Sequence, residues 1–228
     1  PSCCGKSTLC EQINSYFNEI GKPKNVVILS MDRYYFSTGN PLANYDEPAA
    51  LNMQRILTDI KQLIRGESIY APIYDFKTHT TDPYNTTLIH SAPIIILEGI
   101  FVLNNPELVE LATLKVVIDC EEWILVDRRH TRDSSERGRT PIDISKQLPS
   151  VMRGKREFID PLMKKADIVL NNNDHNVFQG QCIILPYIQN LIDSNKKIVQ
   201  EKNVKIENYA KKQAQPLKTW ENFCTLDD

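Results

Sequence analysis

The sequence predicts an α/β fold with a doubly wound, mainly parallel sheet. Three continuous apolar runs, Val26–Leu29, Ile94–Leu97 and Val116–Ile118, are typical of strands, and Ala166–Leu170 is a weaker fourth run. Runs that are apolar on both faces are typical of parallel sheets that are covered by helices. Because amphipathic stretches separate these runs, strand and helix alternate along the chain, which is the pattern of a doubly wound sheet.

Two helices between these strands are predicted from the spacing of their apolar residues. The first helix has one apolar face, made by Leu9, Ile13, Phe17 and Ile20. The second helix has a similar face, made by Ile56, Ile60, Leu63 and Ile64. Both sets follow the helical period, so we expect both helices to pack on the sheet.

One segment, residues 69–90, interrupts the alternation of strand and helix. Ile69–Phe76 and Thr86–Ile89 have the composition of short strands that flank a polar turn. This arrangement predicts an antiparallel hairpin that projects from the main sheet.

Composition and charge exclude several classes of protein. The 228 residues include 27 Lys and Arg against 29 Asp and Glu, so the formal net charge is −2, whereas nucleic-acid binders need a basic surplus. No apolar run approaches the ~20 residues that span a bilayer, and the first residues form neither a signal nor a transit peptide. The six cysteines fit no zinc spacing and favour free thiols in a reducing compartment. We expect a cytoplasmic protein with no nucleic-acid or membrane partner, one domain over residues 1–195 and a polar extension over 196–228.

A phosphate-binding loop is predicted at the start of the chain. Gly5-Lys6-Ser7 precedes an amphipathic helix and matches the end of the pattern G-x-x-x-x-G-K-[ST]. In that pattern the glycine admits backbone N–H groups to phosphate oxygens, the lysine reaches the β- and γ-phosphates, and the hydroxyl ligates Mg²⁺. The first glycine would fall one position before Pro1. We therefore expect the chain to begin inside the motif and to lack the first strand, which feeds this loop.

Carboxylates follow the predicted strands. Asp32 directly follows the predicted strand Val26–Met31, and Glu98 directly follows the second run. The carboxyl ends of parallel strands share one edge of the sheet, where open α/β sheets bind ligands. Beside a phosphate loop, two such carboxylates are suited to holding Mg²⁺ and orienting a nucleophile. A helix cap or a solvent-facing strand end is the alternative for either one. We interpret Asp119, after the third run, as the cap of the helix that starts near Glu121.

Five arginines lie within twelve positions, around a segment of about 133–141 that is predicted to be a loop or lid. They are Arg128, Arg129, Arg132, Arg137 and Arg139. In a chain of net charge −2 such a cluster indicates an anionic ligand, and the planar guanidinium suits a phosphoryl group. A mobile lid that carries arginines also excludes water from a reaction. The alternative is a solvated helix whose arginines pair with Asp127, Asp133 and Glu136.

Several longer motifs occur together and in the same order as in a known family. They are Val26–Asp32 with Tyr35, Asn44–Pro48, Pro72–Phe76 with Thr78 and His79, Leu97–Ile100, and Arg132–Asp133 with Ser135–Arg139. Together they resemble the uridine kinases (uridine–cytidine kinases), and the resemblance runs from Pro1 to about Leu191. The hairpin motif around Tyr74 is the most specific, because other P-loop kinases share the loop and the lid but not this hairpin.

The resemblance implies a P-loop kinase that transfers a phosphoryl group from Mg-ATP to the 5′-hydroxyl of uridine or cytidine, in pyrimidine salvage. It implies that Asp32 is the general base and that Lys6, Arg132 and Arg137 stabilise the transferring group. It further implies an ATP site at Gly5, Lys6, Ser7 and Thr8, and a Mg²⁺ site at Ser7, Glu98 and Asp32.

The resemblance also implies the substrate site and an assembly. Asp46 is expected to bind the ribose hydroxyls, Tyr74 and His79 to bind the edge of the pyrimidine, and Phe76 to pack on its face. Arg129 and Arg139 are expected to complete the nucleoside site, and the family often forms homotetramers. On their own, Tyr74 and Phe76 are equally consistent with core positions, and His79 with an exposed loop.

The alternative functions are a related small-molecule kinase, a signalling GTPase and a truncated nucleoside-binding relic. A nicotinamide riboside kinase and a phosphoribulokinase belong to the same superfamily, although the hairpin motif argues against both. A signalling GTPase needs the motif Asn/Thr-Lys-x-Asp, and the segment Asn195–Ile198 has Ile in place of the Asp. A truncated relic that binds nucleoside without turnover is disfavoured because Lys6, Asp32 and Glu98 are retained.

Overall fold

The computed structural model describes residues 2–18, 24–38, 44–174 and 180–194. It divides into two compact units, Pro1–Leu185 and Pro186–Asp228. The described part of the second unit, residues 186–194, is helical. The predicted extension over 196–228 lies outside the described residues. In the part of the chain that is described, no helix is long and apolar enough to cross a membrane.

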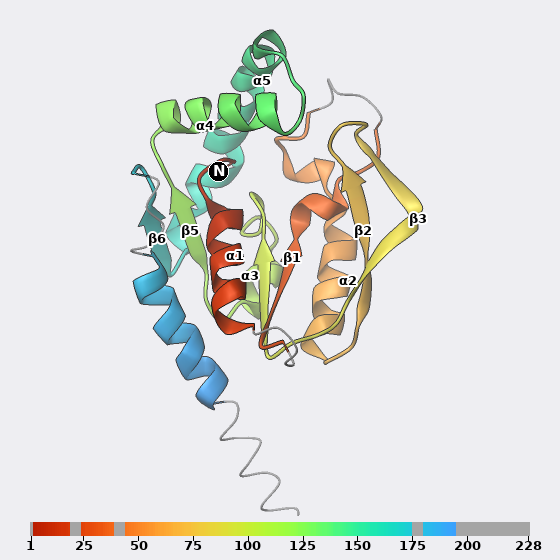
Figure 1. Cartoon of the computed structure of the whole chain (residues 1–228), viewed down its shortest axis with the longest axis vertical. Coiled ribbons are helices and arrows are strands. Elements are labelled where there is room, and N and C mark those ends of the chain that lie inside the picture. Colours follow the sequence, from red (N-terminus) through yellow and green to blue (C-terminus); the bar gives the residue numbers. More distant parts are fainter. Residues whose placement is uncertain (1, 19–23, 39–43, 175–179, 195–228) are drawn as a thin grey trace, which may run out of the picture. The chain divides into compact units, whose positions relative to one another are not determined.

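The first unit contains helices and parallel strand pairs, which confirms the α/β prediction (Figure 1). Strand β1 (Val26–Ser30) pairs in parallel with β4 (Ile94–Glu98), and β5 (Val116–Asp119) pairs in parallel with β6 (Ile168–Asn171). In the first pair Ser30 lies opposite Glu98. Strands β1 and β4 therefore end at the same edge of the sheet.

The apolar runs are less buried than the sequence predicts. Strand β1 is mostly buried, whereas β4 is half-buried at all five positions and Val169 in β6 is 51% exposed. Each strand belongs to a two-stranded ladder within the described residues. The difference between the strands does not follow from strand pairing, because β1 also has one β-neighbour and is mostly buried. The expectation of burial on both faces is wrong for β4 and β6.

The first two helices agree with the predicted faces, with one exception. Helix α1 (Lys6–Phe17) buries Leu9, Ile13 and Phe17, and Ile20 lies outside the described residues. Helix α2 (Met53–Ile64) buries Ile56, Ile60 and Leu63, but Ile64 is 52% exposed. Ile64 lies on the same side of the helix as Ile60, four residues earlier, but it is the last residue of α2 and its side chain is left exposed. The expectation that it packs on the sheet was therefore wrong.

The projecting hairpin is confirmed, with different bounds. Strand β2 (Ile69–Asp75) pairs antiparallel with β3 (Thr80–Ile89), so the second strand begins six positions earlier than predicted. The register shifts between Pro72 and Tyr74, and Phe76 lies in the turn. Asp75 closes this turn by accepting hydrogen bonds from the Lys77 backbone N–H (2.8 Å) and from the Thr78 hydroxyl (2.9 Å).

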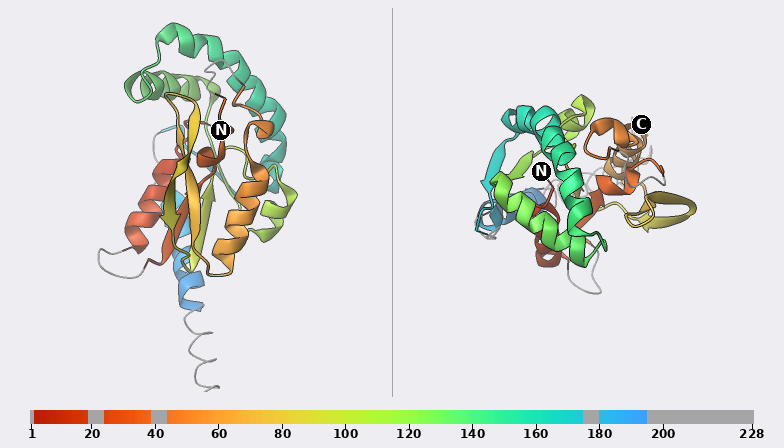
Figure 2. Two further views of the ribbon diagram at one scale, coloured as in Figure 1. Left: turned by 90° about the vertical axis from the view of Figure 1, so that its right-hand side faces the viewer. Right: turned by 90° about the horizontal axis from the view of Figure 1, so that it is seen from above.

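Helices α4 (Glu122–Ser135) and α5 (Pro141–Gly154) cross the carboxyl end of the strands (Figure 2). Thr140 caps α5 by accepting a hydrogen bond from the Asp143 backbone N–H. The predicted lid of about 133–141 is therefore the end of α4 and the short link to α5. The other elements are α3 (Pro106–Leu111), the π-helical turn Lys155–Ile159, and the 3₁₀ turns Met31–Tyr34, Pro48–Ala50 and Asp160–Lys165.

Candidate active site

The Gly5-Lys6-Ser7 segment forms the N-terminus of α1, as predicted. Gly5 precedes the helix with φ 100°, in the left-handed region that favours glycine. A cavity of about 300 Å³ opens above this turn and is lined by Gly5, Lys6, Ser7 and Thr8. Helix N-termini attract anions because their N–H groups and dipole point outward. The backbone N–H groups at the N-terminus of α1 therefore make this cavity suited to an anion. It is called the phosphate cavity below.

Lys6 lies among acidic groups at the floor of the phosphate cavity. Burial by itself lowers the pKa of the Lys6 ammonium, but Cys4, Glu98 and Asp32 more than offset it and raise the pKa above its usual value. The Asn172 amide donates a hydrogen bond of 2.8 Å to the Cys4 carbonyl and ties the loop to the end of β6. Lys6 is therefore a fixed cation in this cavity.

Asp32 and Glu98 meet at the carboxyl edge of the sheet, as predicted. Both line the phosphate cavity. Burial raises the pKa of Glu98 and neighbouring Asp32 adds to the rise, whereas a hydrogen bond from Ser30 and the charge of Lys6 lower it. Two carboxylates with a serine hydroxyl suit Mg²⁺, which takes few protein ligands and completes its shell with substrate phosphates and water. The residues present therefore fit Mg-ATP.

The predicted cap at Asp119 is wrong. Helix α4 has Glu121 as its N-cap residue, and no side chain caps it. Within the described residues, Asp119 Oδ1 is buried without a hydrogen-bond partner. Asp119, the last residue of β5, lies two positions before the N-cap residue Glu121 and so does not occupy the capping position of α4.

A second cavity, of about 420 Å³, lies between the hairpin and the helices α4 and α5. It is lined by all six residues predicted for the nucleoside site: Asp46, Tyr74, Phe76, His79, Arg129 and Arg139. Arg137 and Asp32 line it as well. Asp32 therefore borders both this cavity, called the aromatic cavity below, and the phosphate cavity.

Aromatic rings form one wall of the aromatic cavity. His79 is only 4% exposed, and its Nδ1 lies 3.3 Å from the Tyr74 hydroxyl. Its ring stacks on Tyr45 with centroids 4.9 Å apart and an interplanar angle of 18°. Burial, followed by Arg139 and Arg137, lowers the pKa of His79. His79 is thus a buried, neutral hydrogen-bonding group, and the alternative of an exposed loop residue is wrong.

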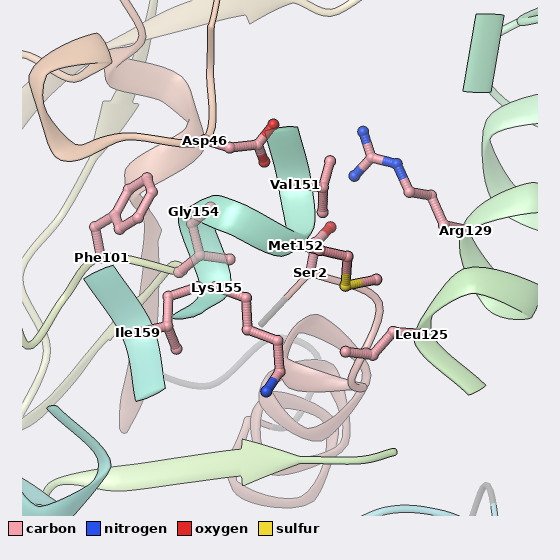
Figure 3. Close-up of a pocket in the computed structure, with 11 residues that line it drawn as sticks. Ser2, Asp46, Phe101, Leu125, Arg129, Val151, Met152, Gly154, Lys155 and Ile159 are labelled. Carbon is pink, nitrogen blue, oxygen red and sulfur yellow. The ribbon is translucent and has the colours of Figure 1, made fainter. Parts of the chain in front are cut away.

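The carboxylate of Asp46 faces the arginines at the opposite wall. Its loop is held by Asn44, whose side-chain oxygen accepts hydrogen bonds from the Asp46 backbone N–H (3.1 Å) and from the Ser150 hydroxyl of α5 (3.0 Å). Burial raises the pKa of Asp46, and Arg129 is the largest opposing influence. Asp46 and Arg129 also line a third, smaller cavity, which Figure 3 shows. In that view the Arg129 guanidinium is directed toward the side where Asp46 lies, and Gly154 lies next to Asp46.

The arginines form ion pairs, as in one of the two predicted arrangements. Arg129, Arg132, Arg137 and Arg139 all pair with Asp133, at 2.7 to 3.7 Å. They are nevertheless not solvated, because the side chains of all four are 9 to 25% exposed and line the two cavities. The fifth, Arg128, lines the phosphate cavity and donates to the Asn172 carbonyl at 2.8 Å.

Three residues of the site were not predicted. Tyr45 lies beside Asp46 in the motif Asn44–Pro48, so its aromatic side chain could have been recognised as a candidate from the sequence. Gln147 accepts hydrogen bonds from Arg129 (3.2 Å) and Arg139 (2.6 Å). It sits in the amphipathic helix α5, where a single glutamine carries no signal. Asn172, which is 5% exposed, follows β6 and looks like an ordinary loop residue in sequence.

The fold and the two cavities are those expected of a P-loop kinase. The chain belongs to the phosphoribulokinase / uridine kinase family, whose sequence profile matches residues 1–178.

Relatives support this assignment. The uridine kinase of Halalkalibacterium halodurans is 34% identical over 179 residues, which cover 75% of this chain and 82% of the relative. The uridine kinase of Clostridium novyi is 32% identical over 199 residues, which cover 84% of this chain and 93% of the relative. A solved "putative fructose transport system kinase" from Silicibacter sp. TM1040 has a TM-score of 0.55 and 15% identity, covering 73% of this chain and 84% of its own. At that identity the similarity shows the fold alone.

Proposed function

We propose that this kinase transfers the γ-phosphoryl group of ATP to the 5′-hydroxyl of uridine or cytidine, as a step of pyrimidine salvage. One observation carries the proposal: the carboxylate of Asp32 borders both the phosphate cavity and the aromatic cavity. A base at that position can take a proton from an alcohol that lies between the two ligands.

On the phosphate side, the proposed roles follow charge. Gly5, Lys6, Ser7 and Thr8 bind the phosphates of ATP, and Lys6, Arg132 and Arg137 stabilise the charge of the transferring group. Ser7, Glu98 and Asp32 hold Mg²⁺, which neutralises phosphate charge when it is bound.

On the nucleoside side, the proposed roles follow hydrogen bonding and shape. Asp46 accepts hydrogen bonds from the ribose hydroxyls, and Phe76 packs on the pyrimidine face. Tyr74 and His79 bind the pyrimidine edge, which a neutral imidazole can do as donor or acceptor. Arg129 and Arg139 complete the site. A neutral nucleoside suits a cavity that combines rings with a few fixed polar groups.

In the proposed reaction the 5′-oxygen attacks the γ-phosphorus while Asp32 takes the hydroxyl proton. The new O–P bond forms as the bond between the γ-phosphorus and the β–γ bridging oxygen breaks, and ADP leaves. Lys6 and the arginines supply fixed positive charge around the equatorial oxygens, and such preorganised charge is usually the largest contribution to catalysis.

The test is a substrate panel with Mg-ATP, using the protein together with any residues that its gene encodes before Pro1. The acceptors are uridine, cytidine, adenosine, nicotinamide riboside and ribulose 5-phosphate. We expect 5′-monophosphates from the pyrimidine nucleosides only, identified by mass spectrometry, and product formation that is slower by a few hundred-fold or more in the Asp32→Asn variant. Turnover of nicotinamide riboside or ribulose 5-phosphate in preference to uridine would contradict the proposal, as would nucleoside binding without turnover.

We further propose, from the resemblance, that residues 1–195 form the kinase domain of a cytoplasmic homo-oligomer. Mass photometry of the protein, and microscopy of a tagged copy in its own cells, test these two points.

A further inference from the structure

A single buried carboxylate lies behind the arginines of both cavities. Asp133, near the end of α4, has no exposed surface. Its two oxygens contact different arginines. Oδ1 accepts hydrogen bonds from Arg132 Nη2 (2.7 Å) and Nε (2.9 Å), and lies 3.7 Å from Arg137 Nη1. Oδ2 lies 3.0 Å from Arg139 Nη1 and 3.5 Å from Arg129 Nε.

These two pairs of arginines have different surroundings. Arg132 lines the phosphate cavity. Arg137 lines the aromatic cavity, with its guanidinium 4.5 Å from the centre of the Phe76 ring, but it also interacts electrostatically with both Arg132 and Asp32. Arg129 and Arg139 line the aromatic cavity and share the Gln147 side chain as acceptor. Oδ1 therefore contacts the two arginines proposed to act on the transferring phosphoryl group, and Oδ2 contacts the two proposed to complete the nucleoside site.

Four guanidinium groups at such short range repel one another unless an anion lies between them. Burial by itself raises the pKa of Asp133, but Arg132, Arg129 and Arg137 outweigh it and hold the pKa below its usual value. Asp133 is therefore an anion at neutral pH. It is not among the described residues that line either cavity, so any effect on substrates passes through the arginines.

We propose that Asp133 is a positioning residue that sets both pairs of arginines and so links nucleoside binding to phosphoryl transfer. The inference rests on the proposed function. It is specific to this carboxylate, because one oxygen orients the catalytic pair and the other orients the nucleoside-binding pair.

The first test is Asp133→Asn, which keeps the shape but removes the charge and places an amide N–H₂ against one arginine pair. We expect the nucleoside KM to rise and kcat to fall, each roughly 10- to 100-fold, because hydrogen bonds between charged groups are lost on both sides. Asp127→Asn, at an exposed carboxylate on the same helix, is the matched control and should leave both constants unchanged.

A double-mutant cycle separates positioning from general damage. In an Arg139→Gln background, Asp133→Asn should raise the nucleoside KM by a smaller factor than in the wild type, because Arg139 is gone and Arg129 is left for Oδ2 to position. Its effect on kcat should persist there, since Arg132 is still present. Additive effects on KM would overturn the proposal, as would a variant with wild-type constants.

Folding and function are checked separately. If Asp133→Asn does not fold, a cycle between Arg132→Lys and Arg139→Lys asks the same question with all charges kept. Two arginines linked through one carboxylate should give effects that differ from additivity by severalfold, and additivity would contradict the linkage. If the wild-type protein phosphorylates no nucleoside, the proposed function fails on its own. Binding of ATP then decides the inference: we expect Asp133→Asn to weaken it about tenfold through Arg132, and unchanged affinity would overturn it.

Discussion

The two cavities on either side of Asp32 are built in different ways. The largest share of the phosphate cavity's lining comes from one short segment, Ser2 to Thr8, and the rest comes from the ends of strands and from α4. The aromatic cavity draws its lining from the loop around Asp46, the hairpin, and both helices α4 and α5. The first offers a local backbone geometry suited to negative charge, whereas the second offers side chains from distant segments to the ring and sugar that we propose it binds.

This difference teaches which changes each cavity tolerates. Backbone N–H groups and a helix dipole are fixed once α1 forms, so the phosphate cavity depends on few contacts. The aromatic cavity depends on how well separate elements pack, so changes outside the cavity alter it. We expect substitutions to divide accordingly into effects on kcat and effects on the nucleoside KM.

The largest effect is expected where the cavities meet. Asp32→Asn keeps the shape of the side chain but removes the base, so we expect kcat to fall by a few hundred-fold or more, within the ~10²–10⁴ typical of general-base catalysis. The uridine KM should change little. Steady-state kinetics with Asp127→Asn as the control measures this, and wild-type turnover would remove Asp32 from the chemistry.

The next effect tests the dependence of the aromatic cavity on packing. A Cβ at Gly154 would lie 2.2 Å from the Asp46 backbone oxygen, so Gly154→Ala must displace the Asp46 loop. We expect the nucleoside KM to rise about tenfold or more, and the ATP KM to stay constant, since overpacking typically costs ~1–3 kcal/mol.

The control for this variant is Gly180→Ala, whose Cβ meets the end of the flexible Leu170 side chain at 2.5 Å. It should leave the nucleoside KM unchanged. Equal KM values for Gly154→Ala and the wild type would mean that the Asp46 loop does not bind the nucleoside.

A smaller effect is expected from the hairpin. His79→Ala removes the partner of the Tyr74 hydroxyl and the ring that stacks on Tyr45. We expect the nucleoside KM to rise about fivefold to tenfold, in keeping with the loss of one buried hydrogen bond, while ATP affinity measured by calorimetry stays the same. An unchanged nucleoside KM would contradict a role in base binding.

The shifted pKa of His79 predicts that both the stability of the protein and the nucleoside KM depend on pH. The pKa of His79 is lowered from its ordinary value of 6.5, so the folded protein resists protonation and the unfolded chain does not. Stability therefore decreases as the pH falls below about 6.5 and on through the folded-state pKa. The nucleoside KM should be constant from neutral pH down to that region and rise below it. In His79→Gln the rise of the nucleoside KM at low pH should disappear. If that rise persists, the titrating group is not His79.

The smallest effect is expected in the support of Asp32. Tyr34 follows in the same 3₁₀ turn, and its hydroxyl donates to buried Asp59 at 2.8 Å, outside both cavities. Tyr34→Phe should lower the free energy of unfolding by about 1–2 kcal/mol, which corresponds to a fall in Tm of a few degrees. Calorimetry measures this, and kcat and KM should not change. A large loss of kcat would show that the turn positions the base.

The charged half of the site could be predicted from sequence because its signals are local. The Gly5-Lys6-Ser7 triplet and the strand-end positions of Asp32 and Glu98 each carry their meaning within a few residues. The parallel pairs and the hairpin were also predictable from apolar runs and turn composition. What sequence did not supply depends on tertiary packing: the ring of Tyr45 on His79, the shared acceptor Gln147, and the exposed end of α2 at Ile64.

The meeting of two cavities at one carboxylate has a kinetic consequence. With donor and acceptor held in separate cavities, both fit at once, and the phosphoryl group can pass directly from one oxygen to the other. No side chain needs to carry it in between. The reaction should then proceed through a ternary complex, with intersecting double-reciprocal plots and inverted configuration at a chirally labelled phosphorus.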